Sequence, residues 1–185
     1  MNNESIFDAE SILKNNAEPS KILAEINQAI AIMLQADRCF LYVRDSETRY
    51  GQAAFCYCRN SEVEDVSSSE WIKEQPADLE EKDPMFAAAL KCKPSIYVED
   101  IEAADPEIVN RDFEVKEFGH RALIHVHLCQ EDKLWGIWQP SVFGQPRIWT
   151  AEDRQIIEAI AFHLTPLVKQ YVQDNFNPSR RKIIK

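Results

Sequence analysis

The stretch that decides the fold is RALIHVHLCQEDKLWGIWQPS, at residues 121–141. It predicts two strands joined by a polar turn at residues 130–133, because apolar and aromatic residues fill both halves. Side chains alternate along a strand, so His125, His127 and Cys129 share one face of the first strand, opposite an apolar face. A hairpin this apolar is not stable alone, so we expect the rest of the chain to supply further strands and a helical layer.

The remaining elements follow from hydrophobic spacing and turn residues. The first half of the sequence predicts helices over 6–14 and 20–35, strands over 39–44 and 51–58, and an acidic connector over 60–82. The second half predicts a helix over 85–91, a strand over 95–98, a short helix over 105–110, the hairpin, and a final helix from 151. Asp83-Pro84 is a helix start, and Thr150 with Asp153 fits a capping box. Pro166 is expected to kink the last helix or to end it early.

This order predicts an α+β fold. Strands joined by short connections pair antiparallel, and helices at both ends of the chain can pack together on one face of a single sheet. The connectors over 60–82 and 102–120 are then left to close the other face, and a concave space under loops is where small molecules bind. We expect an N-terminal extension over 1–19, one domain over 20–172 and a basic tail over 173–185.

Composition and charge narrow the classes of function. The 185 residues carry a net charge of −10, which repels phosphate backbones and anionic lipid, so we expect no nucleic-acid binding. No apolar run approaches the length of a membrane span and the N-terminus lacks a signal pattern, which predicts a cytoplasmic protein without membrane insertion. Five cysteines, an odd number, favour reduced thiols. In the basic tail, Arg180, Arg181 and Lys182 are candidates for docking an acidic partner.

An ordered set of segments resembles a GAF domain, especially the GAF domains of phytochromes and cyanobacteriochromes. The segments are DRCFLYVR at 37–44, ALKCKPSIYVEDI at 89–101, RALI at 121–124 with LWGI at 134–137, and QPRIW at 145–149 ahead of the helix that contains Glu152. The resemblance spans residues 20–172. It implies a PAS-related antiparallel sheet of five to six strands, with the N- and C-terminal helices on one face and a loop-lined pocket on the other.

The resemblance also implies a sensory role, dimerisation through the terminal helices, and a small ligand or none. Bilin-binding members carry a Cys-His pair in the loop after the Asp-Ile pair, and that pair would fall near Val109-Asn110 here. The loop over 102–118 holds no cysteine, so we expect no covalent bilin at the usual position, and the cofactor is unknown. Because the sequence ends soon after the last predicted helix, we expect any output to lie in a partner protein, in trans.

Seven residues are candidates for lining a ligand pocket: Phe113, Phe118, His120, His125, His127, Cys129 and Trp138. The two histidines and the thiol of the first hairpin strand also suit a metal chemically, yet residues two apart on a strand lie ~7 Å apart, so no metal site is assigned. The tryptophan has a plainer interpretation as a core residue.

The sequence therefore predicts a stand-alone, non-enzymatic GAF module that binds a small ligand or a protein partner in signalling. One alternative is a cysteine-dependent reductase of free methionine sulfoxide, for which Cys92 is the thiol nearest to a suitable place. Another is a ligand-free assembly factor whose pocket is filled by its own side chains. No catalytic residue is assigned.

Overall fold

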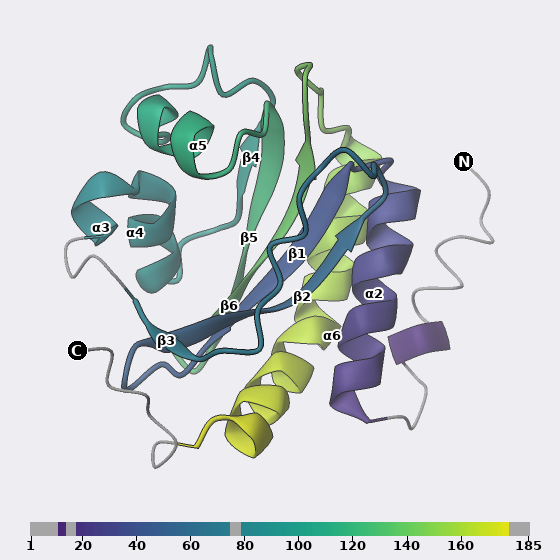
Figure 1. The fold of residues 1–185 in the computed structure, drawn as a ribbon, viewed down its shortest axis with the longest axis vertical. Helices are drawn as coiled ribbons and strands as arrows, with labels where there is room; N and C mark the ends of the chain where they lie inside the picture. Colours follow the sequence, from purple (N-terminus) through teal and green to yellow (C-terminus); the bar gives the residue numbers. More distant parts are fainter. Residues whose placement is uncertain (1–10, 14–17, 75–78, 178–185) are drawn as a thin grey trace.

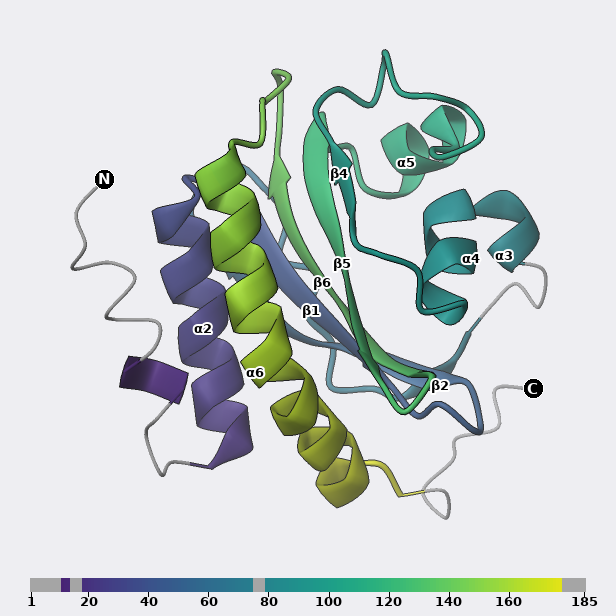
Figure 2. The same cartoon turned by 180° about the vertical axis from the view of Figure 1, so that it is seen from behind.

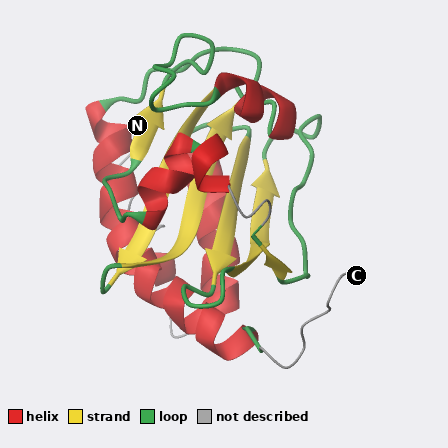
Figure 3. Cartoon of the chain, turned by 90° about the vertical axis from the view of Figure 1, so that its left-hand side faces the viewer, coloured by secondary structure: helices red, strands yellow, loops and turns green. Residues whose placement is uncertain are grey.

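The computed structural model describes residues 11–13, 18–74 and 79–177, and it shows three layers (Figure 1). A six-stranded sheet lies in the middle. Helices α2 (Pro19–Met33) and α6 (Ala151–Asn175) lie side by side over one face (Figure 2). Helices α3 (Leu79–Lys82), α4 (Pro84–Leu90) and α5 (Arg111–Glu117) lie with long connectors over the other face (Figure 3). The fold is therefore α+β, as the sequence predicts.

All neighbouring strands pair antiparallel, in the order β3-β2-β1-β6-β5-β4. The strands are β1 (Arg38–Arg44), β2 (Tyr50–Cys58), β3 (Ile72–Lys73), β4 (Ile96–Val98), β5 (Ala122–Gln130) and β6 (Lys133–Val142). The two hairpins β1–β2 and β5–β6 are joined through β1 and β6, where Arg38 pairs with Ser141. The predicted β5–β6 hairpin is thus part of the interior of the sheet.

The main hydrophobic core lies between the sheet and the two long helices. It contains apolar side chains of α2, α6, β1, β5 and β6, with Trp138 fully buried among them. Asn27 of α2 is buried in this layer, and its Oδ1 accepts hydrogen bonds from Trp138 Nε1 at 2.9 Å and from Cys39 Sγ at 3.2 Å. One polar side chain therefore ties α2 to both central strands.

Helix starts follow the local sequence closely. Asp83 caps α4, where its Oδ1 accepts hydrogen bonds from the backbone N–H groups of Met85 and Phe86, and Pro84 occupies the first turn. Thr150 and Asp153 form the predicted capping box of α6. Both predicted helix starts are confirmed.

Three local predictions were wrong. The short helix predicted over 105–110 does not form: residues 106–108 make a turn, and α5 begins at Arg111, where the Asn110 side chain caps it by accepting from Phe113 N–H. The connector over 60–82 contains β3, which pairs with the outer side of β2. Of the two outcomes expected at Pro166, a kink or an early end, the early end is wrong, because helix α6 continues to Asn175. The predicted helix over 6–14 falls mostly outside the described residues, as does the basic tail with Arg180, Arg181 and Lys182.

Among the described residues, no helix combines the length and apolar character that crossing a bilayer would need.

Candidate functional site

The candidate site lies on the face of the sheet that the two long helices do not cover. Cys39 and Leu41 of β1 belong to the helix-side core, so the alternating residues Arg38 and Phe40 face the loop side. Both are almost completely buried: Arg38 contacts the connector before β3 at Glu64, and Phe40 contacts Phe118 in the segment after β4. This alternation places a charged residue and an aromatic ring beneath the loops.

Five side chains on this face form a closed circuit of ring contacts, which we call the Arg38 cluster: Arg38, Phe40, Phe118, His120 and Phe143. The Arg38 guanidinium carbon lies 5.6 Å from the centre of the Phe40 ring and 5.0 Å from that of Phe143. Phe118 stacks on Phe40 at 6.2 Å and on His120 at 5.4 Å, and His120 meets Phe143 edge-on at 6.2 Å. The cluster thus joins β1 to the start of β5 and the end of β6.

Several buried polar atoms around this cluster have no hydrogen-bond partner within the described part of the chain. They are Arg38 Nε and Nη2, His120 Nδ1, Gln139 Nε2 and Ser141 Oγ. The register of β1 and β6 explains why they gather, since Ser141 pairs with Arg38 and Gln139 with Phe40. Buried polar groups are normally hydrogen-bonded, so a group of unpaired ones marks a place where a partner is expected.

A buried carboxyl group supports His120. Oε2 of Glu114, on α5, lies 2.8 Å from Nε2 of His120, and both side chains are almost inaccessible to solvent. Burial raises the pKa of Glu114 to about 8 and lowers the pKa of His120 to about 3, with Arg38 lowering the latter further. At neutral pH the Glu114 carboxyl therefore donates to a neutral His120. The remaining hydrogen of His120 is then on Nδ1, the unpaired nitrogen.

The histidines of β5 form a second hydrogen-bonded chain on the same face. His127 Nδ1 lies 2.7 Å from the carbonyl oxygen of Lys93, so it carries the hydrogen and donates. His127 Nε2 must then accept from His125 Nδ1, which lies 2.9 Å away. Burial lowers the pKa of both imidazoles, most strongly that of His125. This chain fixes the segment before β4 onto β5.

The structure brings together part of the predicted pocket. Phe113, Phe118 and His120 meet in and beside the Arg38 cluster, with Phe113 at 6.1 Å from Phe118. His125 and His127 lie on the same face, on the strand that pairs with β4. Cys129 follows them, and its thiol lies 3.8 Å from the carbonyl oxygen of Ala89.

Trp138 does not join this group. It pairs with Leu41 in the register of β1 and β6, and it therefore faces the helix-side core. The plainer interpretation of this residue as a core tryptophan is the one that the structure supports.

Six residues of the site had not been singled out from the sequence: Arg38, Phe40, Glu114, Gln139, Ser141 and Phe143. The signal for the first two was present in the alternation of DRCFLYVR, because a strand with one apolar face turns Arg38 and Phe40 to the other. Glu114 lies on a helix that the sequence did not predict, and Phe143 follows the end of β6.

The thiols give little support to metal binding. All five cysteines are free, and Cys56 and Cys58 on β2 have their sulfur atoms 3.8 Å apart. Across the described ranges, no three His, Cys, Asp or Glu side chains lie close enough together to hold a metal ion. Val109, near which the resemblance places the cysteine of bilin-binding members, is buried in a small apolar cluster with Met85 and Leu123.

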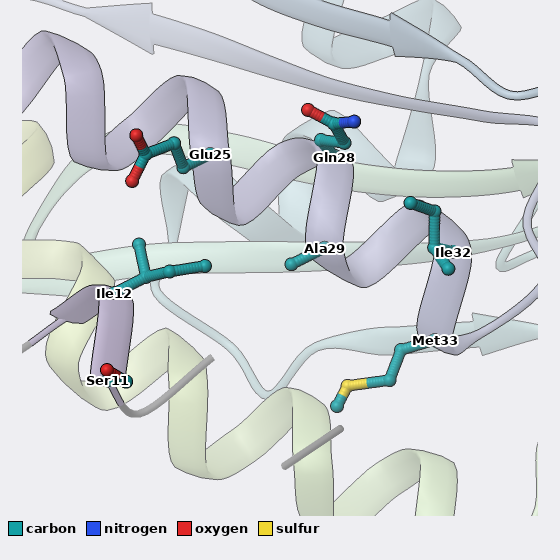
Figure 4. Close-up of a pocket in the computed structure, with 7 residues that line it drawn as sticks. All are labelled: Ser11, Ile12, Glu25, Gln28, Ala29, Ile32 and Met33. Carbon is teal, nitrogen blue, oxygen red and sulfur yellow. The ribbon is translucent and has the colours of Figure 1, made fainter. Parts of the chain in front are cut away.

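Two of the hollows among the described residues lie away from the Arg38 cluster. One is a groove of about 400 Å³ along the outer side of α2, where Ile12, Ile32 and Met33 provide apolar walls (Figure 4). The other, of about 540 Å³, is polar and lies beside the start of α6, with Arg59, Arg147 and Asp153 among its lining residues. Neither is on the face where the unpaired polar atoms gather.

A family model of the GAF domain matches residues 18–165. A comparison with curated proteins finds no match. Among solved structures, the chain resembles the chromophore-binding domain of an unusual bacteriophytochrome from R. palustris, with a TM-score of 0.71, 17% identity, and coverage of 94% of this chain but 62% of that one. It also resembles the phycocyanobilin-bound GAF domain of a cyanobacterial phytochrome, with a TM-score of 0.71, 14% identity, and coverage of 96% and 99%.

The similarity extends to a protein of another kind. The GAF domain of an Acinetobacter phosphoenolpyruvate-protein phosphotransferase has a TM-score of 0.69 at 10% identity, and the match covers 95% of this chain and 100% of that one. At such identities these structures show the shared fold alone.

Proposed function

Because the chain belongs to the GAF domain family, whose members are sensory and regulatory modules, we propose that it is a non-enzymatic regulatory module that binds a small ligand. The ligand binds on the loop-facing side of the sheet, at the Arg38 cluster. Binding there is passed to a partner protein in trans, in the cytoplasm, where its free thiols stay reduced.

The observation that carries this proposal is the group of unpaired polar atoms at the cluster. Arg38, His120, Gln139 and Ser141 come from three strands or strand ends, and each has a buried polar atom for which the described residues provide no partner. Leaving such an atom unpaired costs about 1–3 kcal/mol, more for a charged group. A fold that gathers four such residues under two connectors resembles a binding site more than a stable core.

The loop over 102–118 has no cysteine, so we expect no thioether bond at the usual position, and the proposed ligand is held without one. The connector that includes Glu64 and the segment from α5 to His120 both reach the cluster, because Arg38 Nη1 donates to the carbonyl oxygen of Glu64. A ligand at this place contacts two connectors at once. Ordering of these connectors is the change that a partner would detect.

Native mass spectrometry of protein purified from its own host, together with an absorption spectrum, tests ligand binding. We expect a mass above the 21.4 kDa of the chain in the native spectrum and the chain mass after denaturation. Native species at the chain mass, or at twice that mass, with no visible absorption and no thermal shift with added metabolites, would favour the ligand-free assembly factor.

We also propose that the protein is not an enzyme, and the raised pKa values of two of its thiols support this. Burial raises the pKa of Cys56 to about 12 and raises that of Cys129, and thiols in this state are poor nucleophiles. We expect no reduction of free methionine sulfoxide. If such activity is found and Cys92→Ser abolishes it, the reductase alternative is correct.

The helical layer is proposed to form a homodimer with a second copy of the chain. Phe162 of α6 is 77% exposed and Ile32 of α2 is 52% exposed, although both helices belong to the main core. Since the inner faces of these helices pack on the sheet, the exposure of both side chains places them on the outer side of the layer. Pairing of two such layers would cover them.

A further inference from the structure

We propose that the ligand of this site is a small planar carboxylate, an aromatic acid, whose carboxylate group binds Arg38 and whose ring enters the aromatic circuit. This inference rests on the proposed function and adds the chemical class of the ligand. It depends on the contrast between two buried arginines, on the donors near one of them, and on the geometry of the rings.

Arg38 and Arg44 lie on the same strand, six residues apart, and both are buried. Arg44 has a carboxylate partner, since its Nε donates to Glu74 Oε1 over 2.6 Å and its Nη2 to Glu74 Oε2. For Arg38, the described residues provide a carbonyl oxygen, that of Glu64 at 3.2 Å, and no carboxylate within ion-pair distance. The fold thus completes one buried guanidinium with an anion and leaves the other open to one.

The lowered pKa of Arg38 agrees with a buried guanidinium that lacks an anionic partner. Burial lowers the pKa of Arg38, and this effect outweighs the more distant acids Glu64 and Asp65, which raise it. A buried guanidinium is the residue best suited to bind a carboxylate through two parallel hydrogen bonds, and two N–H groups of Arg38 are unpaired. An anion therefore satisfies both the charge and the geometry.

The unpaired neighbours can all donate as well. Ser141 has a hydroxyl, Gln139 presents its amide nitrogen, and His120 carries its hydrogen on Nδ1 because Glu114 donates to its other nitrogen. A group that gathers donors around a cation selects an anion over a neutral or cationic ligand.

The rings select a planar ligand. Phe118 is almost parallel to Phe40 and to His120, with interplanar angles of 9° and 11°. In the closed cluster these rings stack on one another, so a ligand ring stacks on Phe40 and His120 only after Phe118 moves aside, and a saturated ring lacks the flat π-face for this contact.

Two rings of the Arg38 cluster, Phe118 and Phe143, lie where a ligand could enter it. Phe118 and Phe143 are partly exposed, and each adjoins an exposed glycine with a left-handed backbone, Gly119 at φ 70° and Gly144 at φ 76°. A Cβ at Gly144 would meet nothing within 4 Å, so the backbone beside Phe143 has free space. Movement of these two rings would open the cluster while Arg38 and Phe40 stay on the sheet.

Isothermal titration calorimetry of the full chain with benzoate tests the inference. We expect benzoate to bind, and neutral benzamide, non-planar cyclohexanecarboxylate and inorganic phosphate each to bind at least about tenfold more weakly. Arg38→Met should lose about tenfold or more in benzoate affinity, whereas Arg59→Met, which removes a partly exposed arginine just after β2, should not change it.

Folding of the variant is checked independently. Replacing an unpaired buried charge by an apolar side chain of similar length should leave the unfolding midpoint of Arg38→Met equal to or above that of the wild type. Ser141→Ala provides a second, smaller change, which should weaken benzoate binding and leave the midpoint unchanged.

The inference is overturned if benzoate does not bind, if Arg38→Met binds it as well as the wild type, or if benzamide or phosphate binds equally well. These results are separate from those for the proposed function. A neutral ligand in the native mass spectrum would keep the regulatory module and reject the aromatic acid, whereas a ligand-free protein that ignores every probe would reject both.

Discussion

Arg44 donates to Glu74 over 2.6 Å, and the two side chains are only 4% and 2% exposed. Glu74 follows β3 in the acidic connector and also accepts from Arg49 at 3.0 Å and from Tyr42 at 3.2 Å. The acidic connector has the composition of a solvated loop, yet the buried carboxylate of Glu74 fixes it to the centre of the sheet.

Glu74→Ala is the first prediction that follows. It leaves the Arg44 charge buried without its partner, and we expect a loss of about 3–5 kcal/mol in the free energy of unfolding, measured by denaturant titration. Glu47→Ala, which breaks an exposed ion pair with Lys133, is the matched control and should cost about 0–1 kcal/mol. Equal costs for both variants would show that the buried pair has no special role.

The second prediction concerns pH and Glu114. Its pKa is raised from the ordinary 4.5 to about 8 in the folded state, so the folded protein binds a proton that the unfolded chain releases. Its contribution to stability is complete below pH 4.5 and is lost as pH rises towards 8. We expect the wild type to lose stability relative to Glu114→Gln across this window, by at most about 1.4 kcal/mol per pH unit.

Two neighbours bear on this measurement. The lowered pKa of His120 acts in the opposite direction, with stability lost as pH falls from 6.5 to about 3. Asp83 has a pKa raised to about 6 and adds its own loss between 3.8 and 6. Both residues are kept in Glu114→Gln, and because the Glu114 charge contributes to the raised pKa of Asp83, the difference reports Glu114 together with its coupling to Asp83. Glu117→Gln, at an exposed position of the same helix, is the control substitution, and a difference for Glu114→Gln that stays flat across this pH window would contradict the prediction.

The third prediction concerns Asn27, which joins α2 to the sheet. Asn27→Ala leaves the indole N–H of Trp138 buried without an acceptor, and we expect a loss of about 1–3 kcal/mol in unfolding free energy. Chemical denaturation of Gln28→Ala, at the exposed neighbouring position, provides the reference. A cost no larger than the reference would mean that the hydrogen bond is dispensable.

The fourth prediction tests the proposed dimer. Phe162→Glu and Ile32→Glu place charges on the outer side of the helical layer, and each should convert the dimer to a monomer in light scattering after gel filtration. Ile148→Glu, at a 75% exposed position in the connector before α6, should leave the dimer intact. A monomeric wild type would reject the interface.

Much of the fold could be predicted because its signals are local. The Asp83-Pro84 start and the Thr150 capping box depend on residues within one turn, and the hairpin depends on alternation that neighbouring residues carry. Strand β3 could not be found this way, since two residues have no periodicity and are held by Arg44 and Arg49 from another part of the chain.

The site was less predictable because it is made of distant pieces. Phe118 and His120 stood out as aromatic residues near the central hairpin, but their neighbours Phe40 and Phe143 are 78 and 25 residues from Phe118. Arg38 could be assigned to the loop face by alternation, yet only the register of β1 against β6 shows which donors surround it. The unpaired state of a side chain is a property of three-dimensional packing and has no pattern in sequence.

The pairing of β1 with β6 also determines when this chain can fold. Arg38 and Ser141 are joined across more than a hundred residues, so closing the sheet carries a large loop entropy and is expected to be the slow step of folding. During synthesis, the β1–β2 hairpin emerges long before β6 and exposes one edge of β1 with its apolar face. A ribosome that stalls before residue 133 would hold a chain prone to pair with other chains, which makes this edge the expected site of chaperone binding.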